Sequence, residues 1–580
     1  MNKPTVSVVL ILNSALERIV NPTDPLHEAV RAAAAHSIAG LLDGFGIPGS
    51  PEVEIRGLDE PPAPGHWIRL AVHGMPCRFA DGLLTAVYCY QTEVPLQPAQ
   101  DAEVFRHLQD LCAAPAESGG ALNTLIEFFQ LAIPAIIGLQ PELLLGPEQI
   151  AAWREGFLAE IQPKEPKPVD WPPDEAFFAE LLNPLLRMGL SLAGRAAIAT
   201  VLQGGLETGR EPGDIAEDLI AALQPKAWEI QLPHDYFREI TLAQTETKPG
   251  EFALLRDGLF YELGIYYPDF QFVLVEDLKP SSFRFKLGQI ATLPLRGLGP
   301  KECLVNGSED RLAVLQIRGR PAANPANSNE CAIIDADLRQ VAEGAGFTTW
   351  QSIGYIVLAF AAELRRQSWR CVTNKSVQAQ LSSLSRAFPA LRNAALTRFT
   401  PEQIARTLRS VLAEEISIRN LRTVLELLLQ SDYIVVKDLS KYIVFDDRLP
   451  LIMQPKEPWD NDAGNLAAVV RSGLKRQISH KYTRGASTLI VYLLDPEIEA
   501  RLTPDARPEA ELAEKILKAV RQELQSISRY AQIPAILTTI EVRAILRDLL
   551  KYEFPTLAVL AYQELSPNLN IQPIARISFS

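Results

Sequence analysis

Histidine, cysteine and acidic residues bind metals and transfer protons, so their spacing shows what chemistry a chain can carry. The seven histidines are scattered, and no two of them have the i, i+4 spacing of helical ligands. His73 and Cys77 are four residues apart, but Gly74 and Pro76 between them favour a turn. Zinc needs about four converging ligands. We therefore expect no metal site.

Motifs for phosphate binding and nucleophilic catalysis are also missing. The sequence contains no G-x-x-x-x-G-K-[ST], G-x-S-x-G or H-E-x-x-H, and no G-x-G-x-x-G follows an expected strand. The adjacent acidic pairs Glu414-Glu415 and Asp446-Asp447 are expected to face solvent. We therefore expect that the chain binds no cofactor and is not an enzyme. The remaining alternative is an enzyme whose site assembles from residues that are distant in the sequence.

Composition excludes several classes of protein. The chain has 580 residues, 47% of them apolar, and a net charge of −14, so it is a folded chain whose field opposes nucleic acid and anionic lipid. One basic stretch stands out, and we expect it to be a surface helix with solvated charges. The alternatives are contact with an acidic partner or a subunit, and contact with nucleic acid. The stretch comprises Arg471, Lys475, Arg476, His480, Lys481 and Arg484.

Membrane and export signals are weak. The longest apolar stretch, residues 125–146, contains Glu127 and Glu142, so we expect a buried or amphipathic helix pair. Residues 6–12 are expected to form a strand rather than the core of a signal peptide. The six widely spaced cysteines indicate buried thiols in a reducing compartment. We expect no transmembrane helices and no direct membrane insertion.

Strand and helix periods alternate along the chain. Phe283, Phe285 and Leu287 have the period of a half-buried strand, and residues 488–494 form a short apolar run typical of a buried strand. Thr400-Pro401 predicts the start of a helix. We therefore predict an α/β and α+β multidomain fold of several small mixed subdomains with helical segments.

Two parts of the chain share one order of elements: a helix, a glycine stop, a strand, a proline turn and a second strand. Gly46 and Gly264 are the two stops. One interpretation is that a module in residues 1–100 duplicates a module in residues 246–295. The other is that unrelated α-β-β units look alike, and the sequence leaves both open.

Long motifs in the second half resemble a known family. These are EEISIRNLRTVLELL from Glu414, VVRSGLKRQI from Val469, TLIVYLLDPEIEARL from Thr488, and the segment from Ile533 that ends in YQELSPNLNIQPIARI. They are similar to the cytosolic part of the export-gate family of type III secretion, the flagellar and virulence FHIPEP-type gate proteins. LFYELGIYYP and SSFRFKL extend this resemblance back to about residue 252.

The resemblance implies a function for the cytosolic part alone. The family's gates begin with transmembrane helices, which we do not expect here, and GYIVLAF from Gly354 stands where the family often has a T-H-[LI] segment. Membrane translocation is therefore not carried over. The family's cytosolic domains form homo-oligomeric rings and dock chaperone–substrate complexes in a cleft between subdomains.

The expected partners are secretion-apparatus proteins, chaperone–substrate complexes and further copies of the chain. We expect a non-enzymatic component in the cytoplasm, or peripheral at the inner face of the inner membrane. The alternative is a stand-alone protein-binding adaptor outside secretion. The cleft candidates are Leu293, Leu295, Leu298, Leu304 and Val305, which could instead fill the core of a small insertion. The oligomer-contact candidates are Arg409, Glu415, Arg419, Arg422 and Glu426; Arg419 and Arg422 could instead cap carbonyls at the helix turn.

The resemblance and the proline-rich joints together predict seven parts. They are an N-terminal α/β module (1–100), a helical segment (101–161), a Pro-rich linker (162–175), a helical block (176–245), the first and second export-gate-like subdomains (246–335), a helical third subdomain (336–440) and a C-terminal α/β subdomain (441–580).

Overall fold

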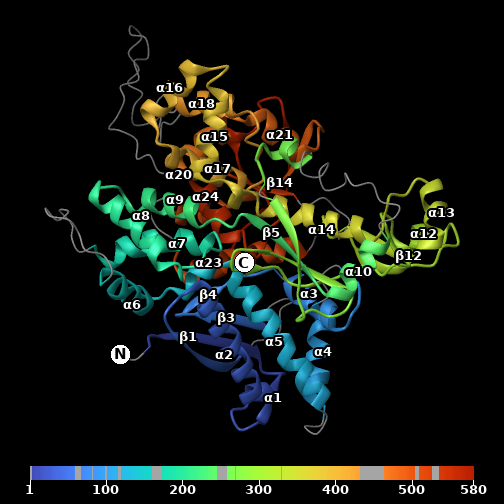
Figure 1. The fold of residues 1–580 in the computed structure, drawn as a ribbon. Coiled ribbons are helices and arrows are strands. Elements are labelled where there is room, and N and C mark those ends of the chain that lie inside the picture. The colour runs from blue at the N-terminus through green and yellow to red at the C-terminus, as the bar shows by residue number, and fades with distance from the viewer. Residues whose placement is uncertain are drawn as a thin grey trace. The chain divides into compact units, whose positions relative to one another are not determined.

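The computed structural model divides the chain into two compact units, which are described separately (Figure 1). Unit 1 contains Met1–Leu259 and Tyr267–Arg365, and unit 2 contains Phe260–Tyr266 and Arg366–Ser580. The structure describes residues 3–58, 67–80, 82–97, 101–114, 119–159, 173–243, 258–267, 269–327, 329–430, 463–502, 508–525 and 534–579. Most of the predicted linker, residues 162–172, lies outside the described residues.

The N-terminal module of unit 1 is built on a four-stranded sheet in the order β2-β1-β3-β4. Its strands are β1 (Thr5–Asn13), β2 (Ser50–Leu58), β3 (Ile68–Val72) and β4 (Met75–Cys77). β1 pairs parallel with β2 and antiparallel with β3. Alternate β1 residues such as Val8 and Leu10 are buried, which confirms the strand predicted over residues 6–12.

Helices follow and cover this sheet. They are α1 (Glu17–Val20), α2 (Pro25–Phe45), α3 (Gly82–Gln91), α4 (Asp101–Ala113) and α5 (Gly119–Leu139). α5 packs against α2, α3 and α4. The next helices are the 3-10 turn η1 (Pro141–Leu144), α6 (Pro147–Leu158), α7 (Glu175–Arg187), α8 (Arg195–Glu207) and α9 (Pro212–Leu223).

The predicted helix pair in residues 125–146 is wrong in detail. A single helix, α5, continues through Pro134 and is followed only by η1. Buried residues on both sides of the proline, Ile133 and Ile136 among them, hold the helix in place despite the lost backbone hydrogen bond. Among the described residues, Gly120–Leu139 is the one segment long and apolar enough to cross a membrane by length and composition.

The second sheet repeats the topology of the first. Its strands are β5 (Ala227–Leu232), β6 (Asp269–Leu274), β7 (Ser282–Leu287) and β8 (Ile290–Ala291), in the order β6-β5-β7-β8, and β9 (Leu295–Arg296) also pairs with β7. β5 pairs parallel with β6 and antiparallel with β7. The matching order and directions support the duplication interpretation, which stays a prediction. The second sheet begins at β5, within the block predicted to be helical (176–245), and not at residue 246.

Aromatic packing closes the second sheet. The helix α14 (Ser352–Arg366) follows the third sheet in the chain and carries Phe360, whose ring lies 5.0 Å from Phe285 and 6.0 Å from Trp228. α10 (His234–Ala243) follows β5 and places Phe237 against Phe272 of β6. β7 confirms the half-buried strand predicted from Phe283, Phe285 and Leu287, all three of which are buried.

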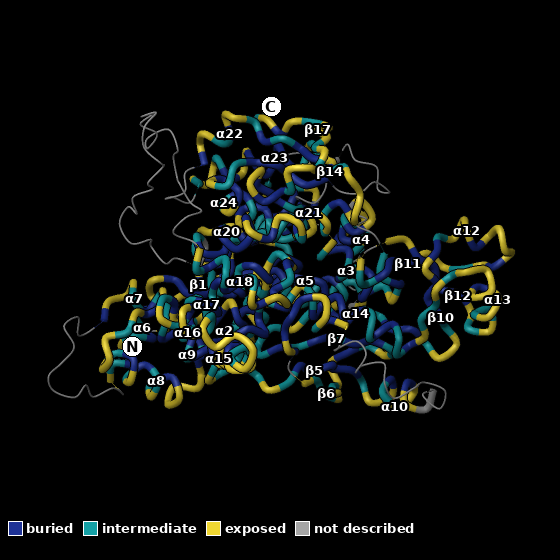
Figure 2. The backbone as a smooth tube through the Cα atoms, turned by 90° about the horizontal axis from the view of Figure 1, so that it is seen from above, coloured by how far each residue is buried: buried dark blue, intermediate teal, exposed yellow. Residues whose placement is uncertain are grey.

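A third sheet is inserted between β9 and α14. Its strands are β10 (Glu302–Val305), β11 (Arg320–Ala323), β12 (Glu330–Asp335) and β13 (Thr349–Trp350), in the order β11-β12-β10-β13. α12 (Glu309–Ala313), the 3-10 turn η3 (Ala336–Leu338) and α13 (Arg339–Gly344) accompany it. Figure 2 shows exposed backbone on the outer turns of this lobe, around α12 and α13.

Unit 2 combines helices with a fourth sheet. The helices are η4 (Ser368–Cys371), α15 (Asn374–Leu384), α16 (Pro389–Arg398), α17 (Pro401–Leu412), α18 (Leu421–Leu429), α20 (Ala463–Gly473), α21 (Lys475–Thr483), α22 (Pro496–Arg501), α23 (Ala510–Gln525), α24 (Ile540–Leu550) and η6 (Tyr562–Glu564). The strands are β14 (Thr488–Leu494), β15 (Ala535–Thr538), β16 (Val559–Ala561) and β17 (Asn570–Ile577).

The fourth sheet is parallel throughout, in the order β16-β15-β14-β17. β14 has the bounds of the predicted strand over residues 488–494. The predicted start of a helix at Thr400-Pro401 is also confirmed, because the Thr400 side chain accepts a hydrogen bond from the Gln403 N–H and Pro401 opens α17.

Candidate partner-binding site

The five cleft candidates differ in how much surface they offer. Leu293 and Leu295 are half-buried, whereas Leu298 is 1% exposed and Leu304 and Val305 are fully buried. Val305 belongs to the core of the inserted lobe. Among the five, only Leu293 and Leu295 therefore keep part of their surface exposed.

The junction between the second and third sheets is tightly built. The Leu298 carbonyl accepts hydrogen bonds from Tyr236 Oη at 3.1 Å and Ser352 Oγ at 2.9 Å. A Cβ on Gly297 would lie 2.1 Å from Tyr236 Oη, so a side chain larger than hydrogen does not fit there. These contacts fix the chain where it leaves β9 for the inserted lobe.

Glu302 holds the same junction through charge. Its side chain contacts the guanidinium groups of Arg296 and Arg320 and accepts a hydrogen bond from the Gly299 N–H at 2.9 Å. Burial opposes ionisation, but the Gly299 N–H and the two arginines outweigh it and lower the pKa of Glu302. Glu302 therefore ties β9 and β11 together as a carboxylate.

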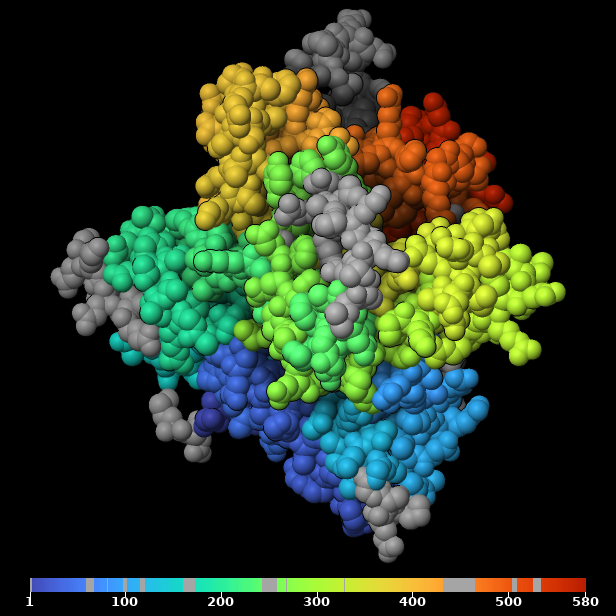
Figure 3. Space-filling model, turned by 45° about the vertical axis from the view of Figure 1, so that its right-hand side comes forward, coloured from blue at the N-terminus to red at the C-terminus, as the bar shows by residue number. Residues whose placement is uncertain are grey.

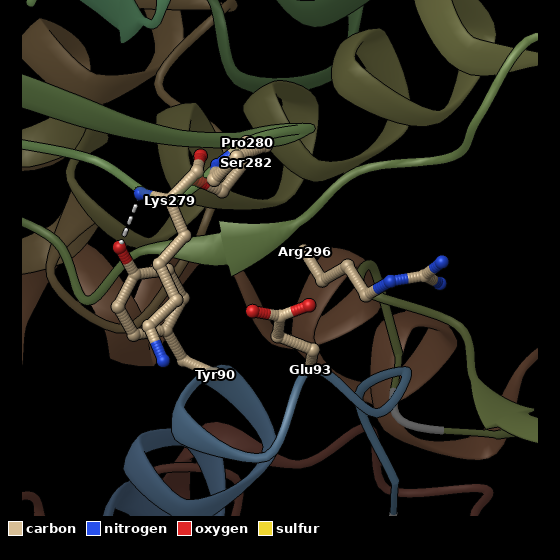
Figure 4. Close-up of a pocket in the computed structure, with 6 residues that line it drawn as sticks. All are labelled: Tyr90, Glu93, Lys279, Pro280, Ser282 and Arg296. Atoms are coloured by element: carbon tan, nitrogen blue, oxygen red, sulfur yellow. Dashed lines mark hydrogen bonds between the residues drawn. The ribbon is translucent and has the colours of Figure 1, made fainter. Parts of the chain in front are cut away.

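A small pocket lies between the N-terminal module and the second sheet (Figure 4). Tyr90 and Glu93 line it on one side, and Lys279, Ser282 and Arg296 line it on the other, with Pro280. Its volume of about 20 Å³ holds roughly one water molecule. It is therefore a seam between two packed parts of unit 1 and too small for an organic ligand.

The oligomer-contact candidates lie in unit 2 and have different surroundings. Arg409 Nε donates a hydrogen bond to the Val372 carbonyl at 3.1 Å. Arg419 donates to the Tyr261 carbonyl at 3.3 Å, and its guanidinium lies over the Tyr261 ring. The carbonyl that Arg419 caps thus belongs to another segment of unit 2 and not to its own helix turn.

The remaining candidates are more exposed. Arg422 and Glu426 form an i, i+4 ion pair on α18 at 2.8 Å, with side chains 52% and 39% exposed. Glu415 lies 3.8 Å from Lys481 and is 44% exposed. Among the five, the Arg422–Glu426 pair offers charge to another molecule, and its role in assembly stays a prediction.

Four charged side chains in unit 2, three of them buried and Glu414 mostly so, form a network that the sequence motifs did not reveal. Arg471 donates to both carboxylate oxygens of Glu564, at 2.5 and 2.9 Å, and both side chains are fully buried. Arg543 donates to both oxygens of Glu414, at 2.7 and 2.9 Å. Arg471 also lies 3.2 Å from Glu414, which joins the two pairs.

The network explains two wrong predictions. Glu414 was expected to face solvent with Glu415, and Arg471 was expected to be a solvated charge on a surface helix. Arg471 is instead fully buried and the Glu414 side chain is only 12% exposed, each against opposite charges, and the predicted helix is divided into α20 and α21 at Leu474. Lys481, from the same basic stretch, donates to the Glu414 and Glu415 carbonyls at 2.8 and 2.9 Å.

Burial and neighbouring charges act in opposite directions on the pKa values of Glu414 and Lys481. Burial raises the pKa of Glu414, but the positive charges of Arg471 and Arg543 outweigh it, and the net shift is downward. Burial lowers the pKa of Lys481, and Glu415 and Glu414 only partly oppose this. Among the described residues there is no group of three or more side chains that could hold a metal ion. The four charges connect the residues that follow α17 with α20, α24 and η6, and so form a structural joint.

Comparison with known proteins shows where this fold occurs. The sequence profile described as the FHIPEP family matches residues 199–570, which is more than half of the chain. The chain belongs to the FHIPEP family. This family comprises the export gates of type III secretion, and all four residues of the buried network fall inside the matched range. Residues 1–198, which include the first sheet, fall outside it.

Individual relatives agree with this assignment. The Low calcium response locus protein D of Yersinia pestis is 23% identical over 341 residues, covering 56% of this chain and 44% of the relative. The chain thus spans about half the length of the curated relatives it matches. The solved structure of the Chlamydia pneumoniae CdsV protein is 26% identical, with a TM-score of 0.50, and the match covers 61% of this chain and 98% of the chain in that structure.

The same Chlamydia protein has also been solved in a complex with the CdsO protein. That CdsV chain is 25% identical to this chain, with a TM-score of 0.50. The FHIPEP-like part of this chain therefore has the fold of an export-gate domain that forms a complex with another protein.

Proposed function

We propose that this chain is a non-enzymatic export-gate component of a type III protein secretion apparatus that docks chaperone–substrate complexes and assembles as a ring on the cytoplasmic side of the membrane. The observation that carries the proposal is the match to the solved CdsV structure, which covers 98% of the chain in that structure. Docking requires that polypeptides bind one another. The described residues supply apolar surface and paired charges for such binding.

The expected partners follow from the family. CdsV forms a complex with CdsO, so we expect this chain to bind a further protein of its own secretion apparatus. Chaperone–substrate complexes are expected at the cleft between the second and third sheets. There Leu295 on β9 is half-buried and Arg296 is held by Glu302.

Affinity capture of the tagged full-length chain from its native cells tests the proposal. Quantitative mass spectrometry should show enrichment of secretion ATPase, stalk, switch-protein or chaperone homologues. Enrichment of none of these, with other proteins recovered reproducibly, would contradict a function in secretion and favour a stand-alone adaptor.

A charge placed in the cleft tests the docking surface. Leu295→Asp puts a carboxylate on half-buried apolar surface, and we expect it to reduce chaperone recovery roughly tenfold. Leu139→Asp is the matched control, because Leu139 is 37% exposed at the end of α5, outside the region that matches the family. Equal chaperone recovery by both variants would place the docking surface elsewhere.

A further inference from the structure

The chain's own N-terminal module lies against the proposed docking cleft. The module's helix α3 contacts β9, the strand that carries Leu295. Residues 91–97, here called the cover segment, continue from the end of α3 toward the inserted lobe. Figure 3 shows the light-blue helices of the module next to the yellow-green lobe of the third sheet.

The cover segment reaches an edge of the third sheet. The Ala323 N–H of β11 donates a hydrogen bond to the Leu96 carbonyl at 2.6 Å. β11 is the outermost strand of that sheet, and such strands offer backbone groups to an added peptide. Pro95 is buried, and Val94 and Leu96 are half-buried. An apolar segment of the same chain therefore occupies a backbone position on β11 that a bound polypeptide could use.

The end of α3 is fastened to the second sheet by polar contacts. Tyr90 Oη accepts a hydrogen bond from the Lys279 N–H at 2.9 Å (Figure 4). Lys279 Nζ donates to the Gln91 carbonyl at 2.9 Å and lies 3.6 Å from Glu127 of α5. Helices α3 and α5 also contact β9 and β8 of the second sheet. The polar contacts at Tyr90 and Lys279 are the part of this interface that single substitutions can weaken.

Tyr355 shows how closely the faces approach. Burial raises the pKa of the Tyr355 hydroxyl, Arg296 opposes the shift, and the thiols of Cys331 in β12 and Cys89 in α3 add to it. Tyr355 of α14 thus lies near both the inserted lobe and the N-terminal module.

We infer that the N-terminal module masks the docking cleft from within the same chain, and that a partner offering an extended apolar segment must displace the cover segment before it binds. This inference rests on the proposed function, because it concerns the regulation of that same cleft. The covering module falls outside the residues that match the FHIPEP family.

Hydrogen–deuterium exchange on the full-length chain measures the opening directly. The Ala323 amide is bonded to the cover segment and loses this bond each time the segment opens. We therefore expect it to exchange at least about tenfold faster than the amides that pair β10 with β12. Tyr90→Phe removes the acceptor of the Lys279 N–H and should accelerate Ala323 exchange by a further factor of roughly ten. Lys279→Met, which removes the Nζ contact to Gln91, should act in the same direction.

Tyr88→Phe is the matched control. Tyr88 lies on the same helix, but its ring packs on His107 of α4 inside the module, so Ala323 exchange should not change. Ala323 exchange that equals the rate of the β10–β12 amides and is unaffected by Tyr90→Phe would overturn the inference. Unchanged thermal unfolding of the variants shows that they remain folded.

Binding gives the second readout. The probe is the chaperone–substrate complex that the wild-type chain recovers most strongly in affinity capture. Its affinity should rise in Tyr90→Phe by the factor measured for opening, because a masked site binds in proportion to its open fraction. Faster Ala323 exchange with unchanged affinity would overturn the masking and leave the proposed function standing. Recovery of no chaperone by either chain would overturn the proposed function, and with it the regulation.

Discussion

Arg471 and Glu564 show how a residue's partners decide its role. A charge removed from water is tolerated when opposite charges and hydrogen bonds surround it, and removal of one partner leaves the others unpaired. Here the Arg471 guanidinium donates to Glu564 and also lies 3.2 Å from Glu414. Loss of the Arg471 side chain should therefore lower the free energy of unfolding much more than loss of an exposed arginine.

We predict that Arg471→Met lowers the free energy of unfolding by about 3–5 kcal/mol. The substitution leaves the Glu564 carboxylate buried without its main partner. Denaturant unfolding of the full-length chain measures this, with Arg422→Met as the control. The Arg422–Glu426 pair is exposed, so its loss should cost less than about 1 kcal/mol. Similar losses in both variants would contradict the account of the network.

Glu414 predicts sensitivity to acid. Its pKa in the folded chain lies below its ordinary value of 4.5 because Arg471 and Arg543 outweigh burial. A lowered folded pKa stabilises the protein above the unfolded value, and that stability is lost as pH falls through the folded pKa. Thermal unfolding between pH 7 and pH 3 should therefore show a loss of stability below pH 4.5 that is shallower in Glu414→Gln. Identical slopes would contradict this.

At the scale of elements, the two glycine stops have the same physical reason. Gly46 ends α2 with φ +68°, and Gly264 ends the helical residues 258–263 with φ +81°. A second backbone approaches each one. A Cβ on Gly46 would lie 2.4 Å from the Ala193 nitrogen, and one on Gly264 would lie 2.2 Å from the Arg419 Cα. Both positions thus exclude a side chain for two reasons, the backbone conformation and the lack of space.

We predict that Gly46→Ala and Gly264→Ala each lower the free energy of unfolding by about 2–4 kcal/mol, the sum of left-handed strain and overpacking. Gly204→Ala is the control. Gly204 lies in α8, and a Cβ there would meet nothing within 4 Å, so the variant should gain up to about 1 kcal/mol. Denaturant unfolding separates the two outcomes, and a neutral Gly264→Ala would contradict the close approach of Arg419.

Signals between neighbouring residues allowed helices and strands to be predicted. Contacts between residues that are distant in the sequence could not be predicted in this way. The cap at Thr400 and the strand over residues 488–494 depend on neighbours in the sequence, and both were predicted correctly. The burial of Arg471 depends on Glu564, 93 positions away, so its basic neighbours misleadingly indicated a surface helix. The cover segment was missed for the same reason, because Leu96 meets Ala323 only in the folded chain.

At the scale of the whole molecule, assembly and stability can be tested apart. Arg422 and Glu426 pair with each other within α18 and remain exposed. Exchanging them, as Arg422→Glu with Glu426→Arg, keeps an i, i+4 ion pair while reversing the charges offered to a neighbouring subunit. The exchange also removes the contact of the Arg422 guanidinium with the Phe388 ring, so it should change the stability of the chain by up to about 1 kcal/mol.

We predict that the wild-type chain forms homo-oligomers at micromolar concentration, and that the exchanged pair weakens assembly at least about tenfold through like-charge contacts between subunits. Mass photometry over a concentration series measures this, and thermal unfolding of both chains checks the fold. Arg339 and Glu343 form a comparable exposed i, i+4 pair on α13 in unit 1, so exchanging them is the control. A wild-type chain that stays monomeric would contradict ring assembly in solution. Assembly weakened equally by both exchanges would show that the effect is one of general charge and not of a contact on α18.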